Sequence, residues 1–365
     1  MPDEDAIPTV CTQMPYRVSI IIRNYNYSTY VSDAIDSALA QTYTNVQVIV
    51  VDDGSTDASR VVIHHYAPQC EIVLQENGGE GAAVNAGVAA ANGDIIIILD
   101  SDDVLAPSAA AVLAALWRPD LSRVHYPMWV MNHGGMVSEE LKPRHMIEPL
   151  ELGAYLHRFG EVPSGALSCN AYAASALRRI LPMDPVRWRS ASDGYLNALT
   201  MAQGSFLSLR TPLGAWRRHA TNWTLRNSTK IGSTGFAVVA HTQLHADVRK
   251  FVGEDKWAEM NAKLPVYHWL HRLFSRRLNP DHPFEDDRLL DLAGHCVSAI
   301  AVRPNTSFLR AAMLYAGVAT GVLLPRAFLR TILAPSVRLA RRDSRSVRIR
   351  PREEKHWRQA FSEIK

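Results

Sequence analysis

The sequence predicts an α/β fold, in which helices flank an open, mainly parallel sheet and a helical extension follows at the C-terminus. Three short apolar runs, 18–22, 46–51 and 95–99, have the composition of strands that are covered on both faces. The segments between these runs carry apolar residues at a helical period. Polar clusters follow all three runs, at the strand ends where open parallel sheets bind their ligands.

Each further element is expected from its own pattern. Residues 30–41 have a helical period and predict the helix between the first two strands. Residues 57–66 and 81–91 predict two more helices, with a short strand at 71–74 between them. The remaining expectations are helices at 109–117 and 194–201, strand-like pieces around 124–131 and 205–209, and helices at 236–251, 257–274, 288–302 and 308–340.

The chain is long enough for more than one folded part. Its 365 residues, 47% apolar and 21% charged, can bury a core and do not indicate disorder. Because single cores stop growing near this length, we expect one large domain with an appended piece. The expected parts are an N-terminal extension at 1–16, an α/β domain at 17–230 with halves at 17–127 and 128–230, a helical region at 231–325 and a basic tail at 326–365.

Cysteine spacing and the N-terminal composition bear on the cellular compartment. The four cysteines lie far apart without CxxC spacing, which argues against a zinc knuckle, a redox pair or a disulfide framework. Residues 1–17 hold three acidic residues and no apolar core of a signal peptide. No apolar run reaches the length of a membrane span. We therefore expect a cytoplasmic chain with reduced thiols.

Three carboxylates follow the third apolar run, at Asp100, Asp102 and Asp103. Their mutual repulsion at a sheet edge would be costly unless a cation binds there. Mg²⁺ or Mn²⁺ is the natural candidate, because these ions prefer oxygen ligands and are often shared with substrate phosphates. The alternative is an acidic turn that caps the next helix. A second acidic cluster at 52–57 is open to the same two interpretations, and the repetition favours a functional site.

A glycine-rich stretch, 77–81, precedes the helix expected at 81–91. Its glycines let the backbone approach a ligand closely, and a helix N-terminus favours an anionic phosphate. The stretch is not a dinucleotide-binding fingerprint, because Val84 stands where the third glycine would be.

Taken together, these motifs resemble those of the family 2 glycosyltransferases, which have the GT-A fold. The resemblance lies in VVDDGSTD, NGGEGAAVNAG and ILDSDDVL, which follow a strand that ends in an asparagine turn, and it covers 18–105. It implies inverting transfer of a sugar from a nucleoside diphosphate donor, with a UDP, GDP or dTDP moiety, assisted by Mn²⁺ or Mg²⁺. Two positions depart from the family pattern: Arg23 stands where proline is usual, and Val84 where many members have arginine.

The resemblance also implies roles for individual residues. Asp102 would be the principal metal ligand, Asp103 a secondary member of the cluster, and Asp100 would face the ribose and the donor sugar. The other donor-binding residues would be Asp53 or its neighbour Asp52 facing the nucleobase, Asn24 and Tyr25 lining that pocket, and Gly79 and Asn85 shaping the loop beneath the donor.

The acceptor side is expected later in the chain. An inverting transferase needs a base for the acceptor hydroxyl, and Asp193 resembles the family's acidic residue at the start of the acceptor-side helix. Without the resemblance, Asp193 would be interpreted as a helix cap. In WRRH, at 216–219, His219 resembles the histidine that completes the metal or diphosphate site, and Arg217 could point the same way toward a phosphate. The nearby tryptophans are more typical of core packing.

The acceptor would be a hydroxyl of a glycan or of a lipid-linked molecule, in the synthesis of a cell-surface polysaccharide or glycolipid. Two other functions fit parts of the pattern. A sugar-phosphate nucleotidyltransferase would also read nucleotides at such a sheet edge, but it would need a basic, glycine-rich triphosphate loop near the N-terminus. A catalytically silent nucleotide-sugar-binding scaffold would keep the fold and have no need of its carboxylates.

The tail at 326–358 is rich in arginine, with apolar residues interspersed. This composition is typical of a segment that lies on anionic lipid, so the chain is expected to be peripheral on the cytoplasmic face of a membrane. The equally weighted alternative is a basic face that packs its apolar side on the α/β domain. We expect no nucleic-acid partner, because no recognised binding motif accompanies the charge.

Overall fold

The computed structural model describes residues 16–143, 151–159, 166–220, 222, 232–260, 264, 266–278, 282–301, 308–325 and 327–329. These fall into two compact units. The first holds 16–143, 151 and 166–218, and the second holds 152–159 and the described residues from 219 onward. The expected N-terminal extension and basic tail lie almost wholly outside the described residues.

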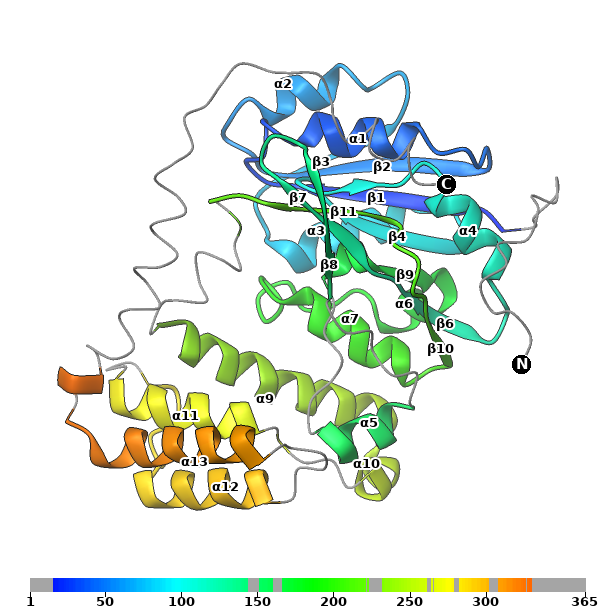
Figure 1. Ribbon diagram of the computed structural model, residues 1–365. Helices are drawn as coiled ribbons and strands as arrows, with labels where there is room; N and C mark the ends of the chain where they lie inside the picture. The colour runs from blue at the N-terminus through cyan, green and yellow to red at the C-terminus, as the bar shows by residue number, and fades with distance from the viewer. Residues whose placement is uncertain are drawn as a thin grey trace. The chain divides into compact units, whose positions relative to one another are not determined.

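The first unit is built on a seven-stranded sheet with the order β10-β6-β9-β4-β1-β2-β3 (Figure 1). Six strands run in one direction, and β9 is antiparallel to both of its neighbours. The predicted α/β class with a mainly parallel sheet is therefore confirmed. The strands are β1 (Val18–Asn24), β2 (Val46–Asp53), β3 (Glu71–Gln75), β4 (Ile95–Asp100), β6 (Leu121–His125), β9 (Asn170–Ala173) and β10 (Ser205–Ser208).

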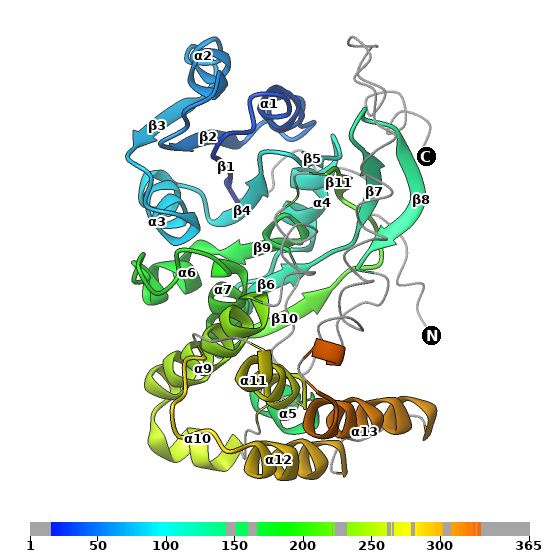
Figure 2. The ribbon, with the colours of Figure 1, turned by 90° about the vertical axis from the view of Figure 1, so that its left-hand side faces the viewer.

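Helices cover both faces of this sheet because its central strands are apolar on both faces. Ile20 and Ile22 of β1 belong to one core cluster with residues of α1 (Val31–Leu39) and α4 (Ala109–Leu116). On the other face, α3 (Glu80–Ala90) packs so closely that a Cβ at Gly87 would overlap Ile21 (Figure 2). The other helices of the unit are α2 (Ser59–His64), α6 (Ala174–Ile180) and α7 (Ser192–Met201).

Strand register aligns the polar ends of the central strands. Asn24 of β1 is opposite Asp52 of β2, and Arg23 is opposite Asp100 of β4. Residues that lie about 30 and 75 positions apart in the sequence therefore meet at one edge, as the alternation of strands and helices predicts.

A second, four-stranded sheet follows the acidic turn, with the order β5-β11-β7-β8. Its strands are β5 (Val104–Leu105), β11 (Gly214–Arg218), β7 (Met128–Asn132) and β8 (Val137–Lys142). Because β5 begins directly after Asp103 and pairs with β11, the strand that carries Arg217 lies beside the acidic turn. The strand-like piece expected around 124–131 is in fact two strands, β6 and β7, in different sheets.

The second unit is helical. Its helices are α5 (Leu152–Phe159), α9 (Gly232–Val252), α10 (Glu254–Met260), α11 (Val266–Leu278), α12 (Leu289–Ala301) and α13 (Phe308–Leu323). Apolar residues of α11, α12 and α13, among them Leu273, Cys296 and Val318, form its core. The single helix expected at 257–274 is divided into α10 and α11, and α5 groups with this unit although it lies within the expected α/β domain. No described helix is both long and apolar enough to cross a bilayer.

Candidate functional site

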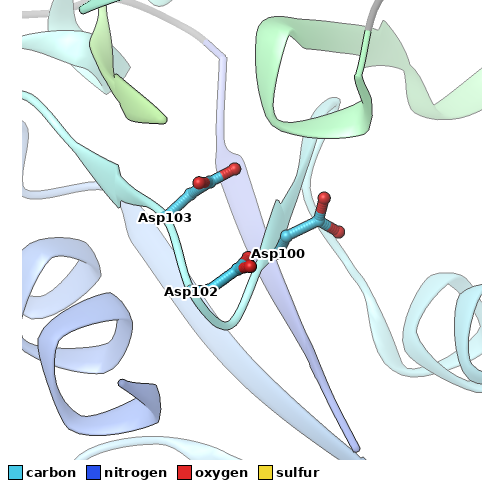
Figure 3. A group of neighbouring side chains, drawn as sticks. All are labelled: Asp100, Asp102 and Asp103. Atoms are coloured by element: carbon cyan, nitrogen blue, oxygen red, sulfur yellow. The ribbon is translucent and has the colours of Figure 1, made fainter. Parts of the chain in front are cut away.

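Three carboxylates project from the turn that ends β4 (Figure 3). Asp100 is the last residue of the strand, and Asp102 and Asp103 lie in the turn before β5. One ligand oxygen from each of the three lies within 4.8 Å of the others. The turn is closed by a hydrogen bond of 3.0 Å from the Asp103 N–H to the Asp100 carbonyl. The structure thus brings together the acidic residues that the sequence singled out.

Asp103 is the most deeply buried of the three, with no exposed surface. Its Oδ1 accepts the Arg217 N–H at 2.9 Å, while its buried Oδ2 has no hydrogen bond among the described residues. Burial, followed by the charges of Asp102 and Asp100, raises the pKa of Asp103 well above its usual value. A carboxylate in this position needs either a proton or a cation.

Arg23 lies across Asp100 and neutralises one side of the cluster. Its guanidinium donates two hydrogen bonds to Asp100 Oδ1, one of them from Nε at 3.1 Å, and lies 3.7 Å from Glu80. Burial alone would lower the pKa of Arg23, but the charges of Asp100 and Glu80 outweigh it and raise the pKa. Arg23, where the family resemblance expects proline, therefore supplies a fixed positive charge at the strand edge.

Arg217 clamps the acidic turn from β11. Its buried guanidinium donates to the Asp102 carbonyl at 2.8 Å, to the His133 carbonyl at 3.2 Å and to Asp33 Oδ2 at 2.9 Å. These contacts place Arg217 beside the predicted metal site, with its guanidinium engaged by the protein. Its role toward a phosphate stays a prediction.

The residues at this edge fit a hard divalent cation. They offer three neighbouring carboxylates, and one of them has a buried oxygen with no hydrogen-bond partner among the described residues. Mg²⁺ and Mn²⁺ take such oxygen ligands and leave positions for water and phosphate. Mn²⁺ or Mg²⁺ could accordingly be held by Asp100, Asp102 and Asp103.

Asn24 and Asp52 join the loops that follow β1 and β2. The Asn24 amide donates to Asp52 Oδ2 at 3.0 Å and to the Ser55 hydroxyl at 3.1 Å, while its Oδ1 is buried without a partner among the described residues. Burial would raise the pKa of Asp52, but hydrogen bonds from Ser55, Arg60 and Asn24 outweigh it and lower the pKa. Tyr25, the next residue, is 45% exposed. Tyr25 is therefore the accessible member of the predicted nucleobase pocket.

Asp53 organises the glycine-rich stretch. Its Oδ1 accepts from Gln75 at 2.6 Å and from the Gly78 N–H at 2.9 Å. Its Oδ2 accepts from the Asn77 side chain at 3.1 Å and from the Gly79 N–H at 2.8 Å. With four donors on two oxygens, Asp53 determines the course of residues 77–79. Its contact with a nucleobase stays a prediction.

The N-terminus of α3 is occupied by protein and is not open to a phosphate. The N–H groups of Glu80 and Gly81 donate to the carbonyls of Arg189 and Trp188, at 2.9 and 3.0 Å. The expectation that this helix end favours a phosphate therefore does not hold in this structure, since its leading N–H groups already have acceptors. The loop instead receives the segment that leads into α7.

Gly79 and Asn85 hold that same segment. Gly79 has φ of +88°, and a Cβ there would meet Arg189 Cγ at 2.5 Å and its carbonyl oxygen at 2.7 Å. Asn85 binds Met183 in both directions, through Nδ2 to the carbonyl at 2.8 Å and through Oδ1 from the N–H at 2.9 Å. Both residues thus shape the connection between the two expected halves of the α/β domain.

Asp193 lies in the first turn of α7, where its Oδ1 accepts the Gly194 N–H at 2.8 Å. The pKa of Asp193 is raised to about 6, first by burial and then by the charge of Glu80, although Arg23 lowers it. Ala191, the residue before α7, has φ of +62°, a left-handed conformation that alanine rarely adopts. A carboxylate with a pKa near 6 has the properties of a general base at neutral pH.

Three residues near the site were not identified from the sequence. Glu80 accepts from Ser192 at the start of α7, at 3.3 Å from the hydroxyl. Burial and then the charges of Asp102 and Asp100 raise the pKa of Tyr27. Lys142, whose pKa is lowered by burial, has its ammonium 3.3 Å from the Trp216 ring centroid. Their proximity to the cluster depends on long-range packing, and no sequence pattern marks it.

His219 follows Arg218 at the start of the second unit. Its Nε2 lies 3.0 Å from the Asn222 amide nitrogen, and its N–H donates to Asn222 Oδ1 at 2.7 Å. Its part in a metal site stays a prediction. Trp188 and Trp216 are buried, which agrees with the packing role expected for them.

Comparisons with known proteins are consistent with this site. A family model described as "Glycosyl transferase family 2" matches residues 19–181, which include β1, β2, β4 and the acidic turn. This match confirms the predicted family and, with the observed sheet, the predicted fold class. Asp193, Arg217 and His219 lie beyond the matched residues.

Two curated relatives are an uncharacterized glycosyltransferase and a chondroitin synthase. The chain is 33% identical over 215 residues to an uncharacterized glycosyltransferase of Nostoc sp. (strain PCC 7120), a match that covers 56% of this chain and 66% of that protein. It is 44% identical over 108 residues to a chondroitin synthase of Escherichia coli, covering 29% of this chain and 16% of the synthase. The chain thus spans less than two thirds of the length of either relative.

Among solved structures, the chain is similar to a mannosyltransferase from Pyrobaculum calidifontis, determined in complex with GDP-Man and Mn²⁺. The identity is 19% with a TM-score of 0.49, and the match covers 91% of this chain and 87% of that one. At this TM-score the likeness says nothing about the ligands of the present chain.

Proposed function

We propose, on the premise that residues 19–181 form a family 2 glycosyltransferase domain, that the chain is an inverting glycosyltransferase. It transfers a sugar from a nucleoside diphosphate donor, with a UDP, GDP or dTDP moiety, to a hydroxyl of a glycan or lipid-linked acceptor. The observation that carries the proposal is the acidic turn at the end of β4, where one oxygen from each of three carboxylates lies within 4.8 Å of the others and Asp103 Oδ2 is buried without a hydrogen-bond partner among the described residues.

The donor is held at the sheet edge. Asp102, with Asp100 and Asp103, holds Mn²⁺ or Mg²⁺, and His219 is a further candidate ligand. When bound, the ion neutralises the charge that develops on the departing diphosphate. Asp52 and Asp53 hold the loops around the nucleobase in place, and Tyr25 offers an exposed ring beside them.

Asp193 removes the acceptor proton. The acceptor oxygen forms a bond to the anomeric carbon, the bond from that carbon to the diphosphate breaks, and the hydroxyl proton passes to the Asp193 carboxylate. One displacement of this kind inverts the configuration at the anomeric carbon. The raised pKa of Asp193 supports the assignment. A carboxylate with a pKa of about 6 is mostly deprotonated at neutral pH and still basic enough to take a proton.

The acceptor class is the less determined part of the proposal. The similarity to a chondroitin synthase over 108 residues supports polymer or cell-surface glycan synthesis. A catalytically silent scaffold would bind the same donors without turnover. A sugar-phosphate nucleotidyltransferase would instead release pyrophosphate from a nucleoside triphosphate.

A panel of UDP-, GDP- and dTDP-sugars tests the proposal. We expect one nucleoside diphosphate to raise the melting temperature of the chain in the presence of Mn²⁺, and the matching sugar donor to be hydrolysed slowly or transferred. Donor binding without turnover on any acceptor would identify the scaffold, and pyrophosphate release would identify the nucleotidyltransferase.

The Asp102→Asn variant tests whether Asp102 is a metal ligand. It keeps the side-chain volume but removes the charge, so we expect the Mn²⁺-dependent part of donor binding to be lost with the fold intact. The matched control is Asp120→Asn in the same unit, whose carboxylate lies in an exposed pair with Arg118. Wild-type Mn²⁺ dependence in Asp102→Asn would disprove the metal assignment.

A further inference from the structure

One end of the helical unit combines exposed apolar side chains with a hollow lined by arginines. The hollow has a volume of about 510 Å³ and is lined by Arg276 and Arg277 of α11, by Asp287 and Arg288 before α12, and by Leu289 to Asp291 at its start. Leu290 projects from its rim and is 76% exposed. We refer to this feature as the basic hollow.

The charge of the basic hollow is positive despite two acidic neighbours. Asp287 is already bound by Arg272 in a bidentate pair, at 2.6 and 2.7 Å, and by His282 at 2.9 Å. Asp291 is exposed. Three arginines therefore face one carboxylate that has no such neutralising partner, and this arrangement suits a phosphate group.

The C-terminal end of α13 borders the basic hollow, because the Arg277 guanidinium donates to the Leu324 carbonyl. Leu323 and Phe328, on either side of that carbonyl, are 77% and 57% exposed. Further along α13, Met313 and Tyr315 are also exposed, and residues 311–323 include no charged side chain. A helix that is apolar all round is normally buried, and no described residue covers the face of α13 that carries Met313 and Tyr315.

We propose that the basic hollow and the apolar residues beside it, Leu290, Leu323 and Phe328, form a docking surface for a membrane that contains anionic phospholipids. The arginines bind headgroup phosphates while the three apolar side chains enter the acyl boundary. The sequence supplies further positive charge where α13 ends, since residues 326–365 hold twelve Lys or Arg and four Asp or Glu.

Charge decides between a membrane and a second copy of the chain. A symmetric contact through this surface would bring like-charged arginines together, which disfavours self-association. An anionic lipid surface complements the same residues. The inference is independent of the proposed transferase activity, because it concerns binding of the helical unit alone.

Flotation of the full chain with vesicles tests the proposal. We expect the chain to float with vesicles of equal parts phosphatidylcholine and phosphatidylglycerol, and not with phosphatidylcholine alone. Leu290→Ser with Leu323→Ser should lower the vesicle partition coefficient about tenfold or more, because two leucines no longer enter the lipid. The matched control is Leu74→Ser with Val186→Ser, two comparably exposed apolar residues of the first unit.

Arg288→Gln provides a second test that leaves the helical core untouched. Arg288 is exposed, so we expect an unchanged circular dichroism spectrum and a several-fold weaker partition into the anionic vesicles. Arg210→Gln, an exposed arginine of the first unit, should have no effect. Raising the salt concentration should remove the difference between Arg288→Gln and the wild type.

Three outcomes would overturn the proposal. The first is wild-type flotation of the double leucine variant, which would leave the tail alone to hold the chain on lipid. The second is binding of inorganic phosphate in the basic hollow without any flotation of the wild type. The third is a change of oligomeric state in the double leucine variant, measured by light scattering, with vesicle binding unaltered.

Discussion

The sheet edge of the first unit and helices α9 and α11 of the second unit differ in how well their polar side chains are hydrogen-bonded. At the sheet edge of the first unit, Asp52, Asp53 and Arg217 each have at least three hydrogen-bond donors or acceptors around them. In the second unit, His268 of α11 is buried and His241 of α9 is half-buried, each with at least one ring nitrogen that has no hydrogen-bond partner among the described residues. His268 has no exposed surface, and neither of its ring nitrogens has a hydrogen-bond partner among the described residues.

The difference appears in the protonation of the two regions. Burial, with smaller contributions from charged neighbours, lowers the pKa of His241 and His245 to about 4 and that of His268 to about 3. The carboxylates of the first unit are instead fixed by donors or paired with Arg23. The sheet edge of the first unit is therefore arranged to hold charge, whereas α9 and α11 of the second unit pack around neutral imidazoles.

The largest effect is expected from removing Asp193, the proposed base in the first unit. Asp193→Asn should lower kcat by roughly 10²- to 10⁴-fold, because a general base contributes about that much, while donor binding is kept. In the wild type, kcat/KM should fall tenfold per pH unit below about pH 6, where Asp193 becomes protonated. Asp184→Asn, an exposed carboxylate nearby, is the control. Unchanged turnover in Asp193→Asn would show that the proton goes elsewhere.

The next largest effect is expected where an added methyl group would collide with a neighbouring segment. Gly79→Ala should destabilise the chain by about 3 kcal/mol or more, because its Cβ would collide with Arg189 at a φ that alanine avoids. Gly253→Ala in the helical unit is the matched control, since it has φ of +86° and no atom within 4 Å of the added Cβ. There we expect about 1 kcal/mol. Equal destabilisation by Gly79→Ala and Gly253→Ala would contradict this expectation.

Acid should affect the helical unit first. Because the folded pKa of His268 lies below the ordinary value, the unfolded chain binds more protons at low pH, and stability is lost as the pH falls below about 6.5. For His268 alone the loss is about 2 kcal/mol at about pH 5. Hydrogen exchange of α11, corrected for the intrinsic pH dependence, measures it. His268→Leu should remove part of the effect, because the pKa values of His241 and His245 are similarly lowered, and His64→Gln, which is exposed, should remove none of it.

The smallest expected effect concerns the strained residue before α7. Ala191→Gly should raise the free energy of unfolding by about 0.5 kcal/mol, since relief of the left-handed strain slightly exceeds the added freedom of the unfolded chain. Ala202→Gly, at the other end of α7 in a right-handed conformation, should lower it. Thermal unfolding of both variants gives the comparison. A loss of stability in Ala191→Gly would mean that the methyl group packs there.

Much of the first unit was accessible from the sequence because its signals are local. Continuous apolar runs predicted β1, β2 and β4, and the polar residues after them lie where parallel strand ends meet. β9 was missed because four residues give too short a pattern, and its antiparallel direction depends on β4 and β6 on either side. The division of 257–274 into α10 and α11 was missed although Pro265, directly before α11, is a residue that interrupts helices.

The site was predictable where chemistry itself needs the residue type. Three close carboxylates require a cation or protons, so Asp100, Asp102 and Asp103 were identifiable before the fold. The contacts of Asp53 with Gly78 and Gly79, and those of Arg217 with the acidic turn, depend on distant segments, and no spacing rule gives them. The phosphate site expected at the N-terminus of α3 could not be excluded from local sequence. The carbonyls of Trp188 and Arg189, about a hundred residues further along the chain, accept the N–H groups there.

The attachment of residues 183–192 to α3 constrains any exchange of the segment that leads into α7. Backbone bonds from Glu80 and Gly81, the two-way pair of Asn85 with Met183, and the fit of Gly79 against Arg189 join the two stretches along their length. Grafting residues 183–192 of a relative alone would leave those partners unmatched. A chimera should therefore take residues 77–85 and 183–192 from the same parent protein.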